Sequence, residues 1–325
     1  MVKRIFCIGE LLIDFVCKDV GVSLASGNNF EKKAGGAPAN VAAAIAKLDG
    51  QAYFLGKVGD DPFGIFLEDT LNKVGVDTSM LIKGGNTTLA FVSIDSNGER
   101  DFKFFRGADG EYSFNDIDLS KMNKGDIIHF GSATGFLPGE LKKTYFELLN
   151  YAVENEMIVS FDPNYRDALI KDINAFKKYS IKFIEKSDFV KLSDEEAMLI
   201  TGRKNLDEAA EEVLRLGARV LAITLGSKGT LIATKNEKDI IPSIKINQVD
   251  STGAGDAFVG AILYQMAKDE ISKNDEWNFN SISQYVAIAN RVGAFTCTSY
   301  GAIASMPTKY DIRRIDDIPE ISTIL

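Results

Sequence analysis

The chain has 325 residues, of which 45% are apolar and 26% are charged, and it carries a net charge of −9. This is the composition of an ordinary globular protein with ample core material, and its acidity argues against nucleic acid and anionic membranes as partners. The chain has three cysteines (Cys7, Cys17 and Cys297), which argues against a disulfide framework, and one histidine (His129), which argues against a histidine-rich metal site. It has no run of eighteen apolar residues that could span a membrane. We therefore expect a cytoplasmic protein.

Short apolar runs alternate with helical patterns, which predicts a mostly parallel sheet covered by helices on both faces, an α/β/α arrangement in one domain, residues 1–325. Each run is nearly continuous in apolar residues, as expected of strands buried on both sides. The predicted strands are Ile5–Gly9, Ala52–Val58, Ile127–Gly131, Ile158–Asp162, Phe189–Leu192, Val220–Thr224 and Ile244–Val249. The predicted helices are Pro38–Leu48, Pro62–Val74, Gly139–Asn155, Glu195–Thr201, Leu206–Leu216, Ala257–Ala267 and Ser283–Ala294.

Two β-rich segments, Thr87–Ser96 and Glu99–Arg106, interrupt this alternation and are joined by an Asn-Gly pair. Asn-Gly between such runs is a strong hairpin signal. Strand periodicity places Phe102, Phe104 and Arg106 on one face of the second segment. The hairpin could therefore close over a polar ligand, or it could simply pack at the edge of the main domain.

The segment Asp250–Asp256, with the sequence Asp-Ser-Thr-Gly-Ala-Gly-Asp, lies between a predicted strand and a predicted helix. Gly253 and Gly255 allow a sharp turn that brings backbone N–H groups to a ligand, and the helix N-terminus favours an anion such as phosphate. A carboxylate, Asp256, is not needed to bind phosphate, but it could accept a proton from a hydroxyl that attacks phosphorus. The alternative is that Asp256 only caps the helix.

Other phosphate-binding motifs do not fit the chain. It has no G-x-x-x-x-G-K-[ST] sequence, which argues against a P-loop protein. A dinucleotide-binding oxidoreductase would need a third glycine and an acidic residue about 20 positions later, and neither is placed so.

Four motifs together carry a resemblance that covers nearly the whole chain: Ala34–Ala42, Phe161–Arg166, Ile223–Gly229 and Asp250–Asp256. In this order and spacing they resemble the PfkB carbohydrate kinases, the ribokinase-like family. The resemblance implies a three-layer ribokinase-like fold with a small β-sheet lid formed by segments near 11–34 and 86–110. It also implies a sugar and ATP as ligands, Mg²⁺, in many members K⁺, and a homodimer formed through the lid.

The resemblance assigns sugar-binding residues to several parts of the chain. Asp14 matches an early aspartate that holds two hydroxyls, although by itself it could be an ordinary acid at a strand end. Asn40 has an amide that can donate and accept, although it could also lie exposed at a helix start. The full substrate-binding set implied is Asp14, Gly35, Gly36, Asn40, Phe104, Arg106, Asn164 and Arg166, the last two nearer the phosphates.

The same resemblance assigns nucleotide and metal positions. Spacing to Thr201-Gly202 selects Glu196 over Glu195 as the residue that orders water around Mg²⁺, while Ser193 stands where asparagine is commoner and has no clear role. Lys191 could meet a phosphate or be a solvated lysine. The nucleotide set is Lys191, Thr224, Gly226, Gly229, Gly255 and Asn290, and the K⁺ set, largely through backbone oxygens, is Asp250, Thr252, Thr296, Ser299, Gly301 and Ser305.

The expected reaction is phosphoryl transfer from ATP to a sugar hydroxyl, with Asp256 as the base and the Gly253-Ala254-Gly255 turn steadying the developing charge. The motifs most resemble those of fructokinases, which implies that fructose is converted to fructose 6-phosphate. Kinases of 2-keto-3-deoxygluconate share much of the pattern, and ribose and nucleosides stay open as substrates. A non-catalytic sugar- or nucleotide-binding relative would be expected to lose Asp256, which is present.

Overall fold

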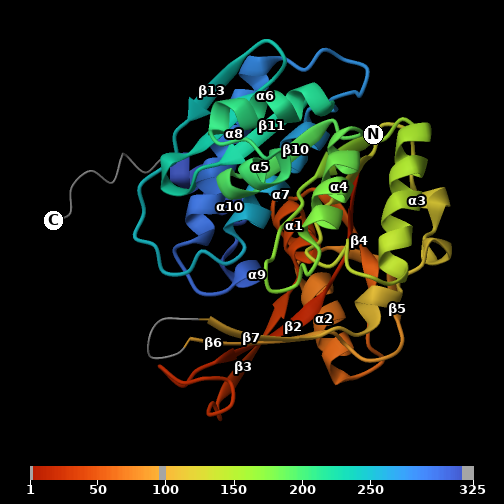
Figure 1. Ribbon diagram of the computed structural model, residues 1–325, viewed down its shortest axis with the longest axis vertical. Coiled ribbons are helices and arrows are strands. Elements are labelled where there is room, and N and C mark those ends of the chain that lie inside the picture. Colours follow the sequence, from red (N-terminus) through yellow and green to blue (C-terminus); the bar gives the residue numbers. More distant parts are fainter. Residues whose placement is uncertain (1–2, 95–99, 317–325) are drawn as a thin grey trace.

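The computed structural model describes residues 3–94 and 100–316, which form two sheets and the helices that cover them (Figure 1). In the larger, nine-stranded sheet, neighbouring strands are parallel except at one edge, where the last two strands of the chain run antiparallel. The strand order is β13 (Lys238–Ile241), β12 (Thr230–Ala233), β11 (Val220–Thr224), β10 (Phe189–Ser193), β9 (Ile158–Phe161), β8 (Ile127–Phe130), β1 (Arg4–Ile8), β4 (Gln51–Val58), β5 (Asp77–Lys83).

Alternation of apolar side chains along these strands builds a core on each face of the sheet. In β1, Ile5 and Cys7 belong to one buried cluster, and Phe6 and Ile8 belong to the other. The first cluster packs under α1 (Ala37–Lys47), α2 (Pro62–Lys73), α7 (Ala254–Lys268) and α8 (Phe279–Thr296). The second packs under α3 (Glu140–Glu154), α4 (Ile173–Ile184), α5 (Asp194–Thr201) and α6 (Leu206–Leu216). The short helices α9 (Ala302–Ser305) and α10 (Lys309–Asp316) follow α8.

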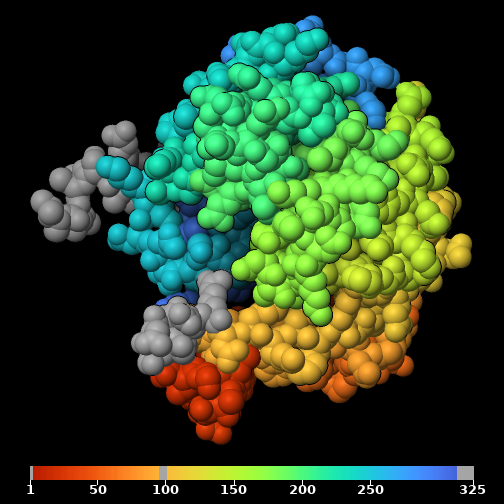
Figure 2. Space-filling view, viewed as in Figure 1, coloured from red at the N-terminus to blue at the C-terminus, as the bar shows by residue number. Residues whose placement is uncertain are grey.

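A separate four-stranded sheet projects from the main body, with the surface hollowed above it (Figure 2). Its order is β3 (Phe30–Gly35), β2 (Leu12–Cys17), β6 (Leu89–Ile94), β7 (Arg100–Phe105). The register pairs Asp14 with Lys33 and Ala90, and Ala90 with Phe104, so these side chains share one face. The opposite face carries contacting aromatic rings from Phe15, Phe30, Phe91 and Phe105.

The fold expected from the sequence is confirmed, including the parallel sheet with helices on both faces and the separate small sheet. The expected hairpin is formed by β6 and β7, although its Asn-Gly turn lies outside the described residues. None of the described helices has the length and apolar character needed to cross a membrane.

Two expectations near the C-terminal motif are wrong. Residues 244–249 form no strand: they follow Pro242, pair with no strand among the described residues, and leave Ile244 and Val249 36% and 45% exposed. Helix α7 begins at Ala254 rather than Ala257, so Gly253 is the residue at the cap position and Gly255 lies in the first turn.

Candidate active site

The N-terminus of α7 forms an open space for an anion. Gly253, the residue before the helix, has a left-handed backbone (φ 78°), and no described side chain caps the helix. A Cβ at Gly255 would lie in ordinary contact with the Lys191 Nζ, at 3.5 Å, so the helix end lies beside an ammonium group. The helix N–H groups and this ammonium therefore border one space that suits phosphate.

Asp256 lies in the first turn of α7, and Gly253 is the residue at the cap position, which excludes the alternative that Asp256 is only a cap. The Asn40 Nδ2 of α1 donates a hydrogen bond to the Asp256 Oδ2 at 2.8 Å. The Asn40 Oδ1 is buried and accepts no hydrogen bond from the described residues. A buried amide oxygen without a donor is costly, so this atom is suited to receive a hydroxyl from a ligand.

Burial raises the pKa of Asp256 to about 6. The hydrogen bond from Asn40 and the charges of Arg166 and Lys191 lower this pKa, whereas the charge of Asp162 raises it. At neutral pH the carboxylate is mostly ionised, and its pKa lies close to the pH at which it would act as a general base.

Asp14 stands on β2 against the glycine turn that precedes α1. A Cβ at Gly35 would lie 2.0 Å from the Asp14 Oδ2, and a Cβ at Gly36 (φ 114°) would lie 2.3 Å from the Glu10 carbonyl oxygen. Only glycine fits at both positions. Burial raises the pKa of Asp14 to about 6, against the lowering effects of Arg166 and Lys33. Because Arg166 acts on both Asp14 and Asp256, the two predicted carboxylates share one electrostatic environment.

Lys191 is buried and pairs with the Asp162 Oδ2 at 3.0 Å, so the alternative of a solvated lysine is wrong. Burial lowers its pKa, but the charges of Asp162 and Glu196 outweigh this and raise it. The Asp162 Oδ1 accepts the Asn164 N–H at 3.0 Å, and the Asn164 Nδ2 donates to the Gly131 carbonyl at 3.1 Å. Asn164 therefore shapes the loop after β9 and aims Asp162 at Lys191.

Ser193 and Glu196 form a capping box at the start of α5, which gives Ser193 a role that the sequence left open. The Glu196 Oε2 accepts the Ser193 N–H and its Oε1 accepts the Tyr165 N–H, both at 2.7 Å. Glu196 thus ties the loop after β9 to α5. Within the described residues no three acidic, histidine or cysteine side chains gather around a metal position.

Four of the predicted nucleotide residues, Thr224, Gly226, Gly229 and Asn290, lie at or against β11 and β12. Thr224 ends β11, and Gly226 and Gly229 flank the turn to β12. The Asn290 amide accepts a hydrogen bond from the Thr230 hydroxyl at 2.7 Å and donates to the Ile241 carbonyl at 2.9 Å. Its side chain therefore holds β12 and the end of β13 against α8.

The predicted cation segment docks onto the glycine turn. The Asp250 Oδ2 accepts the Gly301 N–H at 2.9 Å and its Oδ1 accepts the Thr252 N–H at 2.9 Å. These hydrogen bonds lower the pKa of Asp250, although its partial burial opposes them. The Ser305 hydroxyl donates to the Gly301 carbonyl, and the Thr296 hydroxyl donates to the carbonyl of Val292. Ser299 lies exposed in the same segment, which offers backbone oxygens for a monovalent cation.

Arg106 anchors the base of the small sheet. Its guanidinium donates to the Pro138 carbonyl at 2.6 Å and the Thr134 carbonyl at 3.3 Å, and pairs with Asp109 at 3.4 Å. Phe104 instead stacks on Phe102 and shares the face of the small sheet that carries Asp14. The structure therefore separates two side chains that the alternation pattern placed together.

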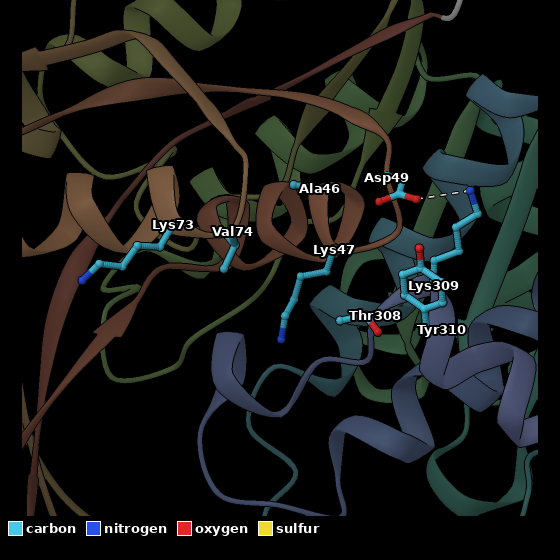
Figure 3. Close-up of a pocket in the computed structure, with 8 residues that line it drawn as sticks. All are labelled: Ala46, Lys47, Asp49, Lys73, Val74, Thr308, Lys309 and Tyr310. Atoms are coloured by element: carbon cyan, nitrogen blue, oxygen red, sulfur yellow. Dashed lines mark hydrogen bonds and ion pairs between the residues drawn. The ribbon is translucent and has the colours of Figure 1, made fainter.

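Two hollows elsewhere contain few of these groups. One, of about 310 Å³, lies between the ends of α1 and α2 and the start of α10 (Figure 3). Its lysines are partly engaged, because Lys47 donates to the Ile303 and Met306 carbonyls and Lys309 pairs with Asp49. The other, of about 600 Å³, lies on the aromatic face of the small sheet, opposite Asp14.

Comparison with known proteins agrees with this geometry. Residues 2–309 match the model of the pfkB family of carbohydrate kinases. The chain belongs to this family. It is therefore a sugar kinase. It is 39% identical to fructokinase-2 of Oryza sativa subsp. japonica over 308 residues, which cover 92% of this chain and 90% of the rice protein.

Solved structures extend the comparison. A double mutant of the fructokinase from Vibrio cholerae O395, with fructose, ADP and potassium bound, superimposes with a TM-score of 0.85 at 31% identity and covers 96% of this chain and 98% of that one. The fructokinase from Xylella fastidiosa with bound ATP superimposes with a TM-score of 0.87 at 30% identity and covers 98% of this kinase and 99% of that chain.

Sequence reasoning missed two charged residues of this site. Asp162 was passed over, although it directly follows β9, where the carboxyl ends of parallel strands gather ligands. Lys33 was also passed over, and only the register of β2 with β3, which places it beside Asp14, draws attention to it.

Proposed function

We propose that this kinase transfers the γ-phosphoryl group of ATP to the 6-hydroxyl of fructose. The observation that carries the proposal is the pairing of Asp256 with Asn40 at the open end of α7. It places a carboxylate, a vacant amide acceptor and an anion space at one point. Relatives named fructokinase, one of them solved with fructose and ADP, support fructose as the acceptor.

The residues divide the work as follows. Asn40 and Asp14 hold sugar hydroxyls, and Asp256 accepts the proton of the hydroxyl that attacks phosphorus. The first N–H groups of α7 and the Lys191 ammonium face the charge that develops on the phosphoryl oxygens. Mg²⁺, when bound, would neutralise phosphate charge. Glu196 would act on the ion indirectly, through water and through the loop after β9 that Glu196 holds in place.

A carboxylated sugar acid such as 2-keto-3-deoxygluconate is the second candidate substrate. Both Arg166 and Lys33 act electrostatically on Asp14, so two cations lie near the sugar-binding carboxylate. Either cation could pair with a substrate carboxylate. Comparing kcat/KM for the two acceptors distinguishes the candidates. Phosphorus NMR of the product from fructose tests the position of transfer: fructose 6-phosphate is expected, and phosphate on any other position would overturn the assignment.

The kcat/KM for sugar is expected to rise as the pH increases from 5 to 7. Asp14 and Asp256 both have a pKa of about 6 and both act as ionised groups, so activity is lost as the pH falls through that value. Initial rates at limiting sugar across this range test the expectation. A profile that stays flat down to pH 5 would contradict it.

Potassium is expected to raise kcat over that in sodium. The segment 296–305 is tied to the glycine turn through Asp250, so a cation bound there would steady the N-terminus of α7. The structure of the Vibrio cholerae protein contains potassium, which supports the proposal. Assays in matched potassium and sodium chloride test it, and equal rates after removal of potassium and ammonium would remove the cation from the account.

We also propose that the small sheet is a lid over the sugar and that two copies of the chain associate through it. Asp14 lies on one face of the sheet, and the other carries the aromatic cluster, in which Phe105 is 53% exposed. An exposed aromatic surface of this kind favours association. Sedimentation of wild-type protein and of Phe105→Ser tests this, with a dimer and a weakened dimer expected.

Cys7, Cys17 and Cys297 are free thiols, which supports a reducing cytoplasm as the location.

A further inference from the structure

Glu10 lies just beyond β1 and is almost fully buried, with 2% of its surface exposed. Its Oε1 accepts the N–H groups of Ala37 at 3.2 Å and Ala133 at 3.3 Å, and its Oε2 accepts the Ser132 hydroxyl. Ala37 is the first residue of α1, directly after the Gly35–Gly36 turn. One carboxyl group therefore fixes the entry to α1 and the segment after β8.

A second buried carboxylate, Asp109, lies at the base of the lid with 1% of its surface exposed. It accepts the Thr88 hydroxyl, and the same hydroxyl oxygen accepts the Gly107 N–H at 2.8 Å. Arg106 pairs with Asp109 at 3.4 Å. Asp109 therefore organises the ends of β6 and β7, where the lid meets the main body.

The Thr134 hydroxyl connects these two groups. Its Oγ1 lies 2.8 Å from the Asp109 Oδ2 and 3.3 Å from the Glu10 Oε2. A hydroxyl has one proton and can donate to only one of two carboxylates. The shorter distance assigns that proton to Asp109, so the Thr134 oxygen must accept a proton from Glu10 or from the Ser132 hydroxyl, whose Oγ lies 3.2 Å away. If Ser132 donates to Thr134, its short contact with the Glu10 Oε2 needs a proton on Glu10, so both arrangements place a proton on Glu10.

Charge leads to the same assignment. Arg106 contacts Asp109 and not Glu10, so it balances the charge of Asp109. Asp109 and Tyr145 are the titratable groups whose charges are coupled to Glu10 in the described chain. Burial raises the pKa of Glu10, and the charge of Asp109 raises it further, against hydrogen bonds that lower it.

We propose that Glu10 is a positioning residue that couples the Gly35–Gly36 turn to the base of the lid through the Thr134 hydroxyl. Its carboxyl group carries a proton in this network. Sugar binding at the turn and closure of the lid then share one hydrogen-bonded network. The inference rests on the proposed sugar site, because it assigns the network to the binding of the acceptor and not of ATP.

Thr134→Val tests the coupling directly, because it removes the shared hydroxyl and leaves both carboxyl groups. Loss of one hydrogen bond is expected to raise KM for fructose about 3- to 10-fold and to leave KM for ATP unchanged. Thr144→Val is the matched control. Thr144, on α3, is equally buried, but its hydroxyl donates to the Tyr112 and Glu140 carbonyls and contacts neither carboxyl group. The KM of Thr144→Val for fructose should equal that of wild type. A Thr134→Val protein with the same KM for fructose as Thr144→Val would overturn the proposal.

Hydrogen exchange in the ligand-free protein gives a readout that does not depend on activity. Exchange in residues 35–40 and 107–110 should be faster in Thr134→Val than in wild type, and unchanged there in Thr144→Val. If wild type phosphorylates no sugar, the proposed function fails and the exchange result alone decides the coupling. Exchange unaffected by Thr134→Val in both segments would overturn it.

Glu10→Gln tests the neutral state. Glutamine keeps the acceptor for the two N–H groups and donates toward Thr134, so it should retain the fructose KM that Glu10→Ala raises. A carboxyl whose folded pKa is raised loses stability as the pH rises above its ordinary value of 4.5. The melting temperature of Glu10→Gln relative to wild type should therefore increase between pH 5 and pH 8. A relative melting temperature that stays constant or falls over this range would show an ionised Glu10 and overturn the assignment.

Discussion

Asp256→Asn is expected to lower kcat by about 10²- to 10⁴-fold and to leave ATP binding nearly intact. The amide keeps the size of the side chain and can still contact Asn40, but it cannot accept the proton of the sugar hydroxyl. Because we propose that the phosphates meet the helix N-terminus and Lys191 rather than Asp256, the affinity for ATP should change little. Steady-state turnover and calorimetric titration with ATP measure the two quantities.

Asp207→Asn is the matched control for this substitution. Asp207 also lies in the first turn of a helix, α6, but it is exposed and pairs with Lys238 on the surface. It should have wild-type turnover. An Asp256→Asn protein that keeps more than about a tenth of wild-type kcat would remove Asp256 from the role of base, since a general base contributes at least about 10²-fold.

Asp14→Ala is expected to raise KM for fructose steeply, with little change in KM for ATP. Each hydrogen bond to a charged group is worth about 1.5–3 kcal/mol, so the loss of a single one corresponds to about 10- to 150-fold in affinity. Asp14 stands where Gly35 makes room for it, between the charges of Arg166 and Lys33. Initial rates over a matrix of both substrates separate the two KM values.

Asp19→Ala provides the control from the same part of the chain. Asp19 follows β2 and is partly exposed, and it accepts N–H groups of Asn28 and Asn29 in the adjoining loop. Its loss should disturb that loop without changing KM for fructose. If Asp14→Ala raises both KM values equally, Asp14 does not bind the sugar.

Local patterns predicted much of this fold because the central strands are short, buried apolar runs that can be recognised without knowing their neighbours. The strand Val220–Thr224 and the helix Leu206–Leu216 have the predicted bounds. The segment Ile244–Val249 also has regularly spaced apolar residues. Whether it forms a strand depends on a partner strand beside it, which is not a local property. Helix α4 was not predicted, although Asp172 caps it and its pattern is amphipathic.

The site shows the same division between local and long-range information. The anion space at Gly253–Gly255 follows from a turn and a helix start, both of which are local. The pairing of Lys191 with Asp162 depends on the adjacency of β9 and β10. The contacts of Arg106 depend on where the chain turns after β7, and strand alternation alone cannot reveal them.

ADP release with a panel of acceptors tests the central claim most directly. Wild-type protein would be assayed with ATP, Mg²⁺ and K⁺ against fructose, 2-keto-3-deoxygluconate, ribose and adenosine, with Asp256→Asn as the blank. The account predicts the highest kcat/KM with fructose and no acceptor-dependent ADP release by the variant. A higher kcat/KM with 2-keto-3-deoxygluconate would contradict the choice of substrate, and no acceptor-dependent release by wild type with any of the four would contradict the proposed function itself.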